Sequence, residues 1–95
     1  MILGAVQEMV LEALAELPAD RGYGAALERY LSTKFDRIIQ AQGIYLALHR
    51  LQRRGFLESE QSSPVPRGRR PLLYRLTPSG EQAVTESRRR KAAFP

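Results

Sequence analysis

The chain has 95 residues, 43% of them hydrophobic and 26% charged, which suits one compact domain and excludes a wholly disordered chain. It contains no cysteine, which excludes disulfides, thiolate metal sites and a cysteine nucleophile, and no apolar run near the roughly 18 residues of a membrane span. The net charge of +5 is concentrated in residues 50–95, which carry eleven basic and four acidic side chains, so we expect a polyanionic partner, with a solubilising surface as the alternative.

The first predicted element is a helix from Ile2 to Leu17. Its apolar positions recur at helical spacing, and three glutamates spaced four residues apart follow the other side. Leu3 and Leu11 lie off the apolar stripe, so the apolar surface is wider than one packing partner requires. We therefore expect a second subunit to cover part of this helix.

Two further helices follow. The second is predicted from about Tyr23 to Lys34, and the third from about Ala41 to Arg54, ending at Gly55 because glycine is favoured just past a helix C-terminus. The core stripe of the third helix consists of Ile44, Ala47, Leu48 and Leu51. This stripe leaves the opposite side of the third helix for solvent or a partner.

The C-terminal half is predicted to hold a hairpin and a closing helix. Strands at Phe56–Glu60 and Leu72–Leu76 flank a polar stretch with three prolines and a glycine, which marks a long hairpin tip. The threonine-proline pair at 77–78 supplies an N-cap and a first helical residue, so a helix should run from Pro78 to about Lys91. We expect one domain over residues 1–91 and a frayed tail at 92–95.

This element order predicts a winged helix-turn-helix, a mostly α member of the α+β class. In such a domain the third helix enters the major groove of DNA, where its exposed side chains reach base edges. Turning about 100° per residue away from the core stripe gives the outward face. Its centre holds Gln42, Leu46, His49 and Arg53, with Tyr45 and Arg50 beside it. A solvated helix face is the competing interpretation.

The predicted hairpin tip carries a second basic cluster. Arg67, Arg69 and Arg70 surround Gly68, and such a tip can enter a minor groove or follow phosphates. Charge and proline at a hairpin also discourage pairing between strand edges, so both explanations stay open. The basic run at 88–91 has a structural explanation, because cations are favoured at a helix C-terminus, and nucleic-acid contact is the open alternative.

Catalytic patterns are missing from the sequence. The single histidine has no acidic residue three or four positions away, and the glycines at 22 and 24 lack the lysine and spacing of a phosphate loop. We expect no enzyme activity, no metal site and no cofactor. Because the N-terminus lacks the positive charge of a signal peptide, we expect a cytoplasmic protein that does not bind membranes.

Three segments resemble the PadR family of winged-helix transcriptional regulators. They are residues 44–51 followed by Gly55-Phe-Leu-Glu58, the Gly22-Tyr-Gly24 start of the second helix, and Arg69-Arg-Pro-Leu-Leu-Tyr-Arg-Leu-Thr-Pro-Ser-Gly80. The resemblance covers about residues 2 to 80. It implies binding of operator DNA as a homodimer, usually as a repressor, with the third helix in the major groove and the wing alongside.

The resemblance also implies roles for individual residues of this chain. Tyr45 and the residues before it correspond to the DNA-contacting region, although Gly43 stands where serine or threonine is common and Leu46 where proline or a polar residue is common. Because the chain resembles the short subgroup without a long C-terminal dimerisation domain, dimerisation would use the first and closing helices. The expected interface residues are Ile2, Leu3, Val6, Val10, Leu11, Ala83 and Val84.

The main hypothesis is therefore a homodimeric regulator on an inverted-repeat operator, bound to double-stranded DNA. Some family members respond to phenolic or drug-like molecules, so the resemblance leaves a small-molecule effector open. A module that binds another protein through its first helix and Leu46 is the alternative from a different class. Non-specific nucleic-acid binding differs from the main hypothesis only in lacking a preferred operator.

Overall fold

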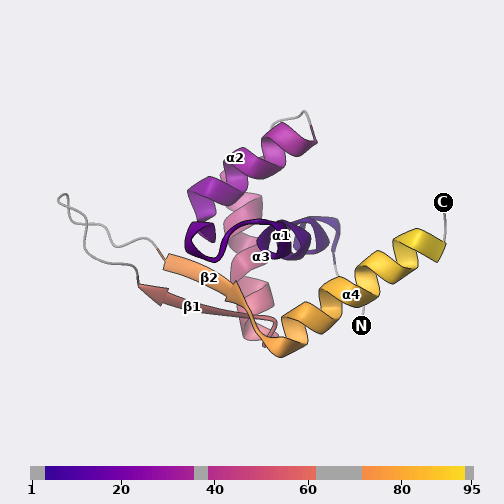
Figure 1. The fold of residues 1–95 in the computed structure, drawn as a ribbon. Helices are drawn as coiled ribbons and strands as arrows, with labels where there is room; N and C mark the ends of the chain where they lie inside the picture. The colour runs from indigo at the N-terminus through magenta and orange to yellow at the C-terminus, as the bar shows by residue number, and fades with distance from the viewer. Residues whose placement is uncertain (1–3, 36–38, 62–71, 94–95) are drawn as a thin grey trace, which may run out of the picture.

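A computed structural model gives the fold and describes residues 4–35, 39–61 and 72–93 (Figure 1). The elements are α1 (Ala5–Glu16), the short 3-10 helix η1 (Ala19–Arg21), α2 (Gly24–Lys34), α3 (Ala41–Arg53), β1 (Leu57–Gln61), β2 (Leu72–Leu76) and α4 (Pro78–Ala93). The two strands pair antiparallel, with Leu57 opposite Leu76. The mostly helical winged helix-turn-helix is therefore confirmed.

The predicted boundaries differ from the observed ones by a few residues. α4 runs to Ala93, two residues beyond its predicted end and into the segment expected to fray. The strand β1 begins one residue later than predicted and ends at Gln61. η1 was not predicted, because three residues leave no periodic pattern. The predicted start of the first helix at Ile2 lies outside the described residues.

α1 is the central element of the core, because α2, α3, α4 and β2 all lie against it. Leu11 is only 1% exposed and joins Val10 and Ala13 in the buried cluster. The prediction that Leu11 lies off the core stripe is wrong. A helix covered on several sides by its own chain needs apolar residues on more than one face, so a wide apolar surface does not by itself indicate a second subunit.

Ion pairs join α4 to the glutamates of α1. Arg90 Nη2 lies 2.8 Å from Glu8 Oε1, and Lys91 Nζ lies 2.5 Å from Glu12 Oε2. A weaker pair at 4.0 Å joins Arg88 to Glu16, which also binds Lys34 of α2. Three of the four residues in the basic run at 88–91 therefore pair with the acidic side of α1, in addition to lying at a helix C-terminus.

The joint between the wing and α4 is built by the predicted threonine cap. The Thr77 hydroxyl accepts a hydrogen bond from the Gly80 N–H at 3.1 Å and donates one to the Gly55 carbonyl at 2.6 Å. The Thr77 N–H donates to the Phe56 carbonyl at 3.1 Å. A Cβ on Gly80 would lie 2.1 Å from that same carbonyl oxygen, so this close approach requires glycine.

Candidate nucleic-acid interface

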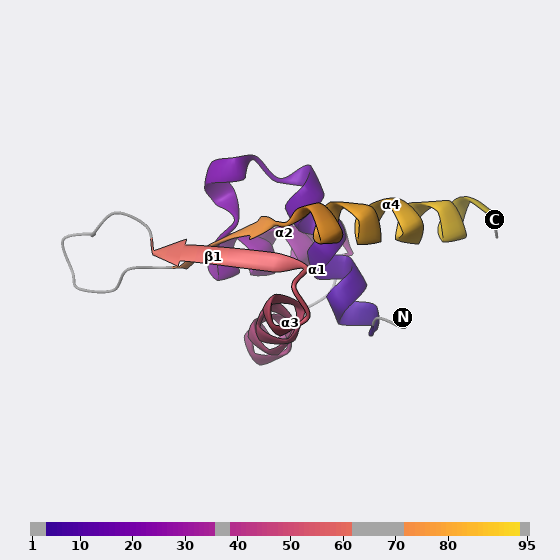
Figure 2. The same cartoon turned by 90° about the horizontal axis from the view of Figure 1, so that it is seen from below.

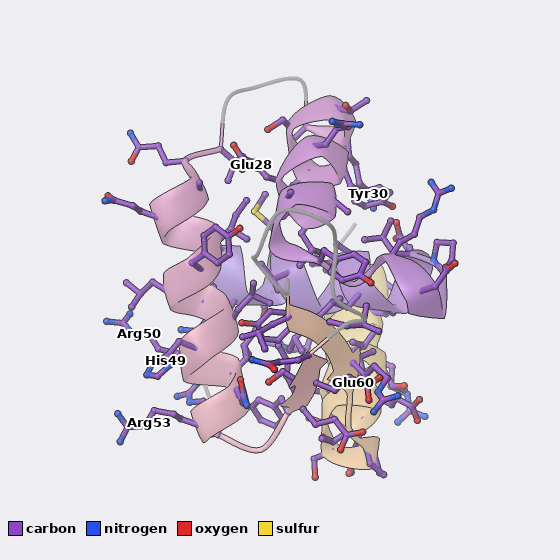
Figure 3. The ribbon with its side chains drawn as sticks, turned by 90° about the vertical axis from the view of Figure 1, so that its left-hand side faces the viewer. Glu28, Tyr30, His49, Arg50, Arg53 and Glu60 are labelled. Atoms are coloured by element: carbon purple, nitrogen blue, oxygen red, sulfur yellow. The ribbon has the colours of Figure 1, made fainter. Side chains whose placement is uncertain are left out.

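The outward face of α3 holds every α3 residue that the sequence predicted to contact DNA. Gln42, Gly43, Tyr45, Leu46, His49, Arg50 and Arg53 are all exposed. On the other side of the helix, Ile44, Ala47, Leu48 and Leu51 are buried, which fixes this orientation. Figure 3 shows His49, Arg50 and Arg53 pointing away from the rest of the molecule.

The position of α3 leaves this face accessible. Figure 2 shows α3 nearly end-on, to one side of the hairpin and α4. Residues 41–53 contain no aspartate or glutamate, so no carboxylate within the helix repels a phosphate backbone. The face combines one neutral amide, one histidine, one leucine and two arginines, a mixture suited to both base edges and phosphates.

A shallow depression lies where the C-terminal end of α3 meets α1. It is lined by Gln7, Arg50, Arg53 and Arg54, and Arg54 Nη1 donates a hydrogen bond to Gln7 Oε1 at 3.2 Å. Within residues 4–35, 39–61 and 72–93, neither Arg50 nor Arg53 takes part in an ion pair. These two guanidinium groups are therefore free to bind an anion such as a phosphate.

Gln7 and Arg54 were absent from the predicted site. Arg54 directly follows Arg53 in the sequence, so its place beside the site could have been predicted from the sequence. Gln7 gives no such signal, because it is 47 residues away from Arg54 and meets it only through the crossing of α1 and α3.

Tyr45 is 50% exposed but is anchored against α2. A Cβ built on Gly24 would lie 2.5 Å from the Tyr45 ring carbon Cε1, so the ring lies over the first residue of α2. Burial raises the pKa of the nearby Tyr74 hydroxyl above its usual 10.0, and the charge interaction with Tyr45 adds to this rise. Tyr45 therefore helps to hold α2 and α3 together, whereas its contact with DNA stays a prediction.

The predicted dimer residues fall into three groups. Val10, Leu11 and Val84 are buried within the single chain, so their side chains have almost no area left for a second subunit. Val6 and Ala83 are partly buried. Ile2 and Leu3 lie outside the described residues, as do Arg67, Arg69 and Arg70 of the predicted wing tip.

A separate groove of about 390 Å³ lies between the end of α1, β2 and α4. Its apolar lining includes Leu14, Leu17, Leu76 and Val84, and Arg88 lies among the charged groups beside them. A small ligand held there would touch α4 and the wing strand at once. Among the described residues, no group of three metal-ligating side chains is found, and no helix is long and apolar enough to cross a membrane.

Relatives of known class match most of the chain. The family model of the PadR-like transcriptional regulators matches residues 10–86. A transcriptional regulator of Mycobacterium tuberculosis is 43% identical over 67 residues, which are 70% of this chain and 60% of that relative. The chain thus spans only about three fifths of the length of this curated relative.

Solved structures share the fold. RosR of H. salinarum superposes with a TM-score of 0.75 at 26% identity, over 96% of this chain and 76% of that one. A PadR-like transcription factor from Bacteroides fragilis gives a TM-score of 0.79 at 20% identity, over 94% of this chain and 82% of that one. With the family match over residues 10–86, these likenesses lead to one conclusion: the chain belongs to the PadR-like family of transcriptional regulators, which are not enzymes.

Proposed function

We propose that this protein is a homodimeric repressor that binds an inverted-repeat operator with α3 in the major groove. The observation that carries the proposal is the exposed face of α3, which has a histidine, a glutamine and two arginines without ion pairs among the described residues, and which contains no carboxylate. In this arrangement Gln42 and His49 contact base edges, and Arg50 and Arg53 contact bases or phosphates.

Two copies of α3 must then be presented to successive major grooves on one side of the duplex. Half-sites of such dimers lie one helical turn apart, roughly 34 Å. Because Val10, Leu11 and Val84 are used in the core, a dimer through α1 and α4 uses residues that keep exposed area, with Val6 and Ala83 among them. Sedimentation of the purified protein tests this part, and a monomer at micromolar concentration contradicts it.

The proposed repression follows from occupation of the operator by the dimer. A dimer on an operator that overlaps a promoter excludes RNA polymerase from the same stretch of DNA. A reporter gene behind the selected operator should therefore be silenced when the protein is expressed and restored by the double variant described next. A reporter that rises with expression would reverse the sign of regulation without removing DNA binding.

Selection of bound duplexes from a random library is the direct test of DNA binding. We expect an inverted repeat to be enriched, and its binding to fail in a variant with His49→Ala and Arg50→Ala. Gln82→Ala on the exposed side of α4 is the matched control and should bind like the wild type. Recovery of no motif with weak binding indicates non-specific association, and Leu46→Asp then tests binding to a protein partner instead.

A further inference from the structure

Leu46 and Gly43 stand out on the α3 face, because one is a half-exposed apolar side chain and the other has open space where a side chain would lie. Leu46 is 49% exposed in the middle of a polar surface, with Gln42 one turn before it and His49 and Arg50 one turn after. About half of this apolar side chain stays in contact with water in the single chain. A single exposed leucine is ordinary on a protein surface, so what makes Leu46 informative is its position beside Gly43 on the candidate DNA-binding face.

Gly43 is the second observation. A Cβ on Gly43 would meet nothing within 4 Å, so the space beside this residue is open. Glycine is less favourable than alanine in a helix, and at this position no neighbouring atom compensates for that cost. The fold would accept a side chain at residue 43, whereas a molecule that closely approaches the helix backbone would not.

The two positions are neighbours on the helix surface. Residues three apart lie on the same side of a helix, so Leu46 lies on the side of α3 that carries Gly43, with its side chain more than 4 Å from a Cβ built on Gly43. We call this pair the methyl seat, which is the open space beside Gly43 together with the exposed Leu46 side chain. Polar side chains of Gln42, His49 and Arg50 surround this methyl seat.

In the major groove, the C5-methyl group of thymine is the one apolar group that base edges present. We propose that the methyl seat of Gly43 and Leu46 receives this methyl group, and that each operator half-site therefore carries a thymine facing residue 43. The inference rests on the proposed function, because it places α3 in the major groove. It adds a specificity-determining contact that the arginines do not supply.

Replacement of thymine by deoxyuridine tests the seat, because the two bases differ only by the C5-methyl group. Each thymine of the selected operator is replaced in turn, and binding is measured by titration. Burial of one methyl group corresponds to about a fourfold change in affinity, so replacement at the seat should weaken binding about fourfold. Symmetric replacement in both half-sites should weaken it by roughly tenfold or more.

Two variants connect the effect to the seat. Leu46→Ala should bind the thymine and deoxyuridine operators equally, since it removes the apolar wall. Gly43→Ala should keep or raise the thermal midpoint of unfolding, yet weaken binding to the thymine operator, since its Cβ fills the seat. Gln82→Ala should keep the full difference between the two operators.

The results separate this inference from the proposed function. If every replacement leaves affinity unchanged, or if Leu46→Ala keeps the same preference for thymine as the wild type, the methyl seat is wrong while operator binding stands. If Gly43→Ala binds as tightly as the wild type, close approach to the backbone is wrong. If no duplex is enriched by the wild type at all, the proposed function fails, and the inference fails with it.

Discussion

The glycines at positions 24, 43 and 80 differ in what a side chain at each position would contact. Gly80 lies so close to the Phe56 carbonyl that the backbone itself excludes a side chain. Gly24 faces the end of the Tyr45 ring, which is a side chain that can rotate away. Gly43 faces open space. The same substitution to alanine should therefore have three different consequences.

Gly80→Ala should lower the free energy of unfolding by about 1–3 kcal/mol, because an added methyl group must push α4 away from the Phe56 carbonyl. Gly24→Ala should cost less, since the Tyr45 ring can swing into solvent. Urea denaturation of both variants measures the difference. Equal losses would mean that the wing joint is more adaptable than its hydrogen bonds indicate.

The raised pKa of the Tyr74 hydroxyl leads us to expect that the protein loses stability in alkaline solution. Its pKa is raised in the folded state, mainly by burial and secondarily by Tyr45. Below pH 10 the hydroxyl is protonated in both states, so its contribution is constant. Above about pH 10 the unfolded chain loses this proton first, so the free energy of unfolding should fall as pH rises. Tyr74→Phe should flatten this decline in urea titrations at alkaline pH; an unchanged slope would contradict the assignment.

At the scale of elements, α4 is held by its first turn and by its ion pairs rather than by a broad apolar face. Val84 and Ser87 are buried, Ala83 is partly buried, and most other described positions of the helix are exposed. Its first turn is fixed by Thr77, and its last turns by Glu8 and Glu12 of α1. The helix therefore depends on polar contacts at both ends.

Thr77→Ala should lower the free energy of unfolding by about 0.5–2 kcal/mol, because it removes the cap on the Gly80 N–H and the hydrogen bond to the Gly55 carbonyl. Thr77→Ser keeps the hydroxyl and should recover most of the loss. Thermal unfolding followed by circular dichroism makes the comparison. A serine variant as unstable as the alanine variant would shift the cause to the lost methyl group.

The ion pairs between α1 and α4 predict a salt-sensitive helix end. Glu8→Gln and Glu12→Gln should each cost about 0.2–1 kcal/mol at low salt, and this cost should shrink as salt screens the pairs. Glu86→Gln is the control, since Glu86 is exposed and has no ion pair within the described ranges. Hydrogen exchange along α4 at two salt concentrations measures the effect, and equal protection in all variants contradicts it.

At the scale of the whole molecule, two groups of basic residues differ in their partners. Arg88, Arg90 and Lys91 of α4 pair with the acidic side of α1, whereas Arg50 and Arg53 extend from α3 without such partners in the described part of the chain. Net charge alone cannot distinguish these two groups. Of these two groups, only Arg50 and Arg53 should contribute strongly to the salt dependence of DNA binding, together with the predicted contacts of Arg67, Arg69 and Arg70.

A dimer that neutralises about six phosphates should show a slope of log K against log salt near −5. Arg53→Ala removes one contact per protomer and should make the slope less steep by about 2 per dimer. Arg90→Ala, whose side chain already pairs with Glu8, should leave the slope nearly unchanged. Titration of a labelled operator at several salt concentrations measures all three slopes, and a wild-type slope near zero would contradict binding through phosphates.

Sequence alone was enough to establish the order of elements, the cap at Thr77 and the outward face of α3. These features depend on residues within one or two turns of each other, whose periodicity and capping act locally. Most of the candidate DNA-binding face on α3, including Leu46, could therefore be predicted from local periodicity, whereas Gly43 was indicated by the resemblance to the PadR family.

Tertiary structure decided which surfaces remain available. It buried Leu11 and Val84, placed Gln7 beside Arg54, turned the Tyr45 ring onto Gly24 and paired Arg90 with Glu8. Each of these contacts joins segments that are distant in the chain, and each follows from how helices cross and cover one another. A one-dimensional pattern indicates that a side is apolar or charged, but the packing of distant elements determines what covers it.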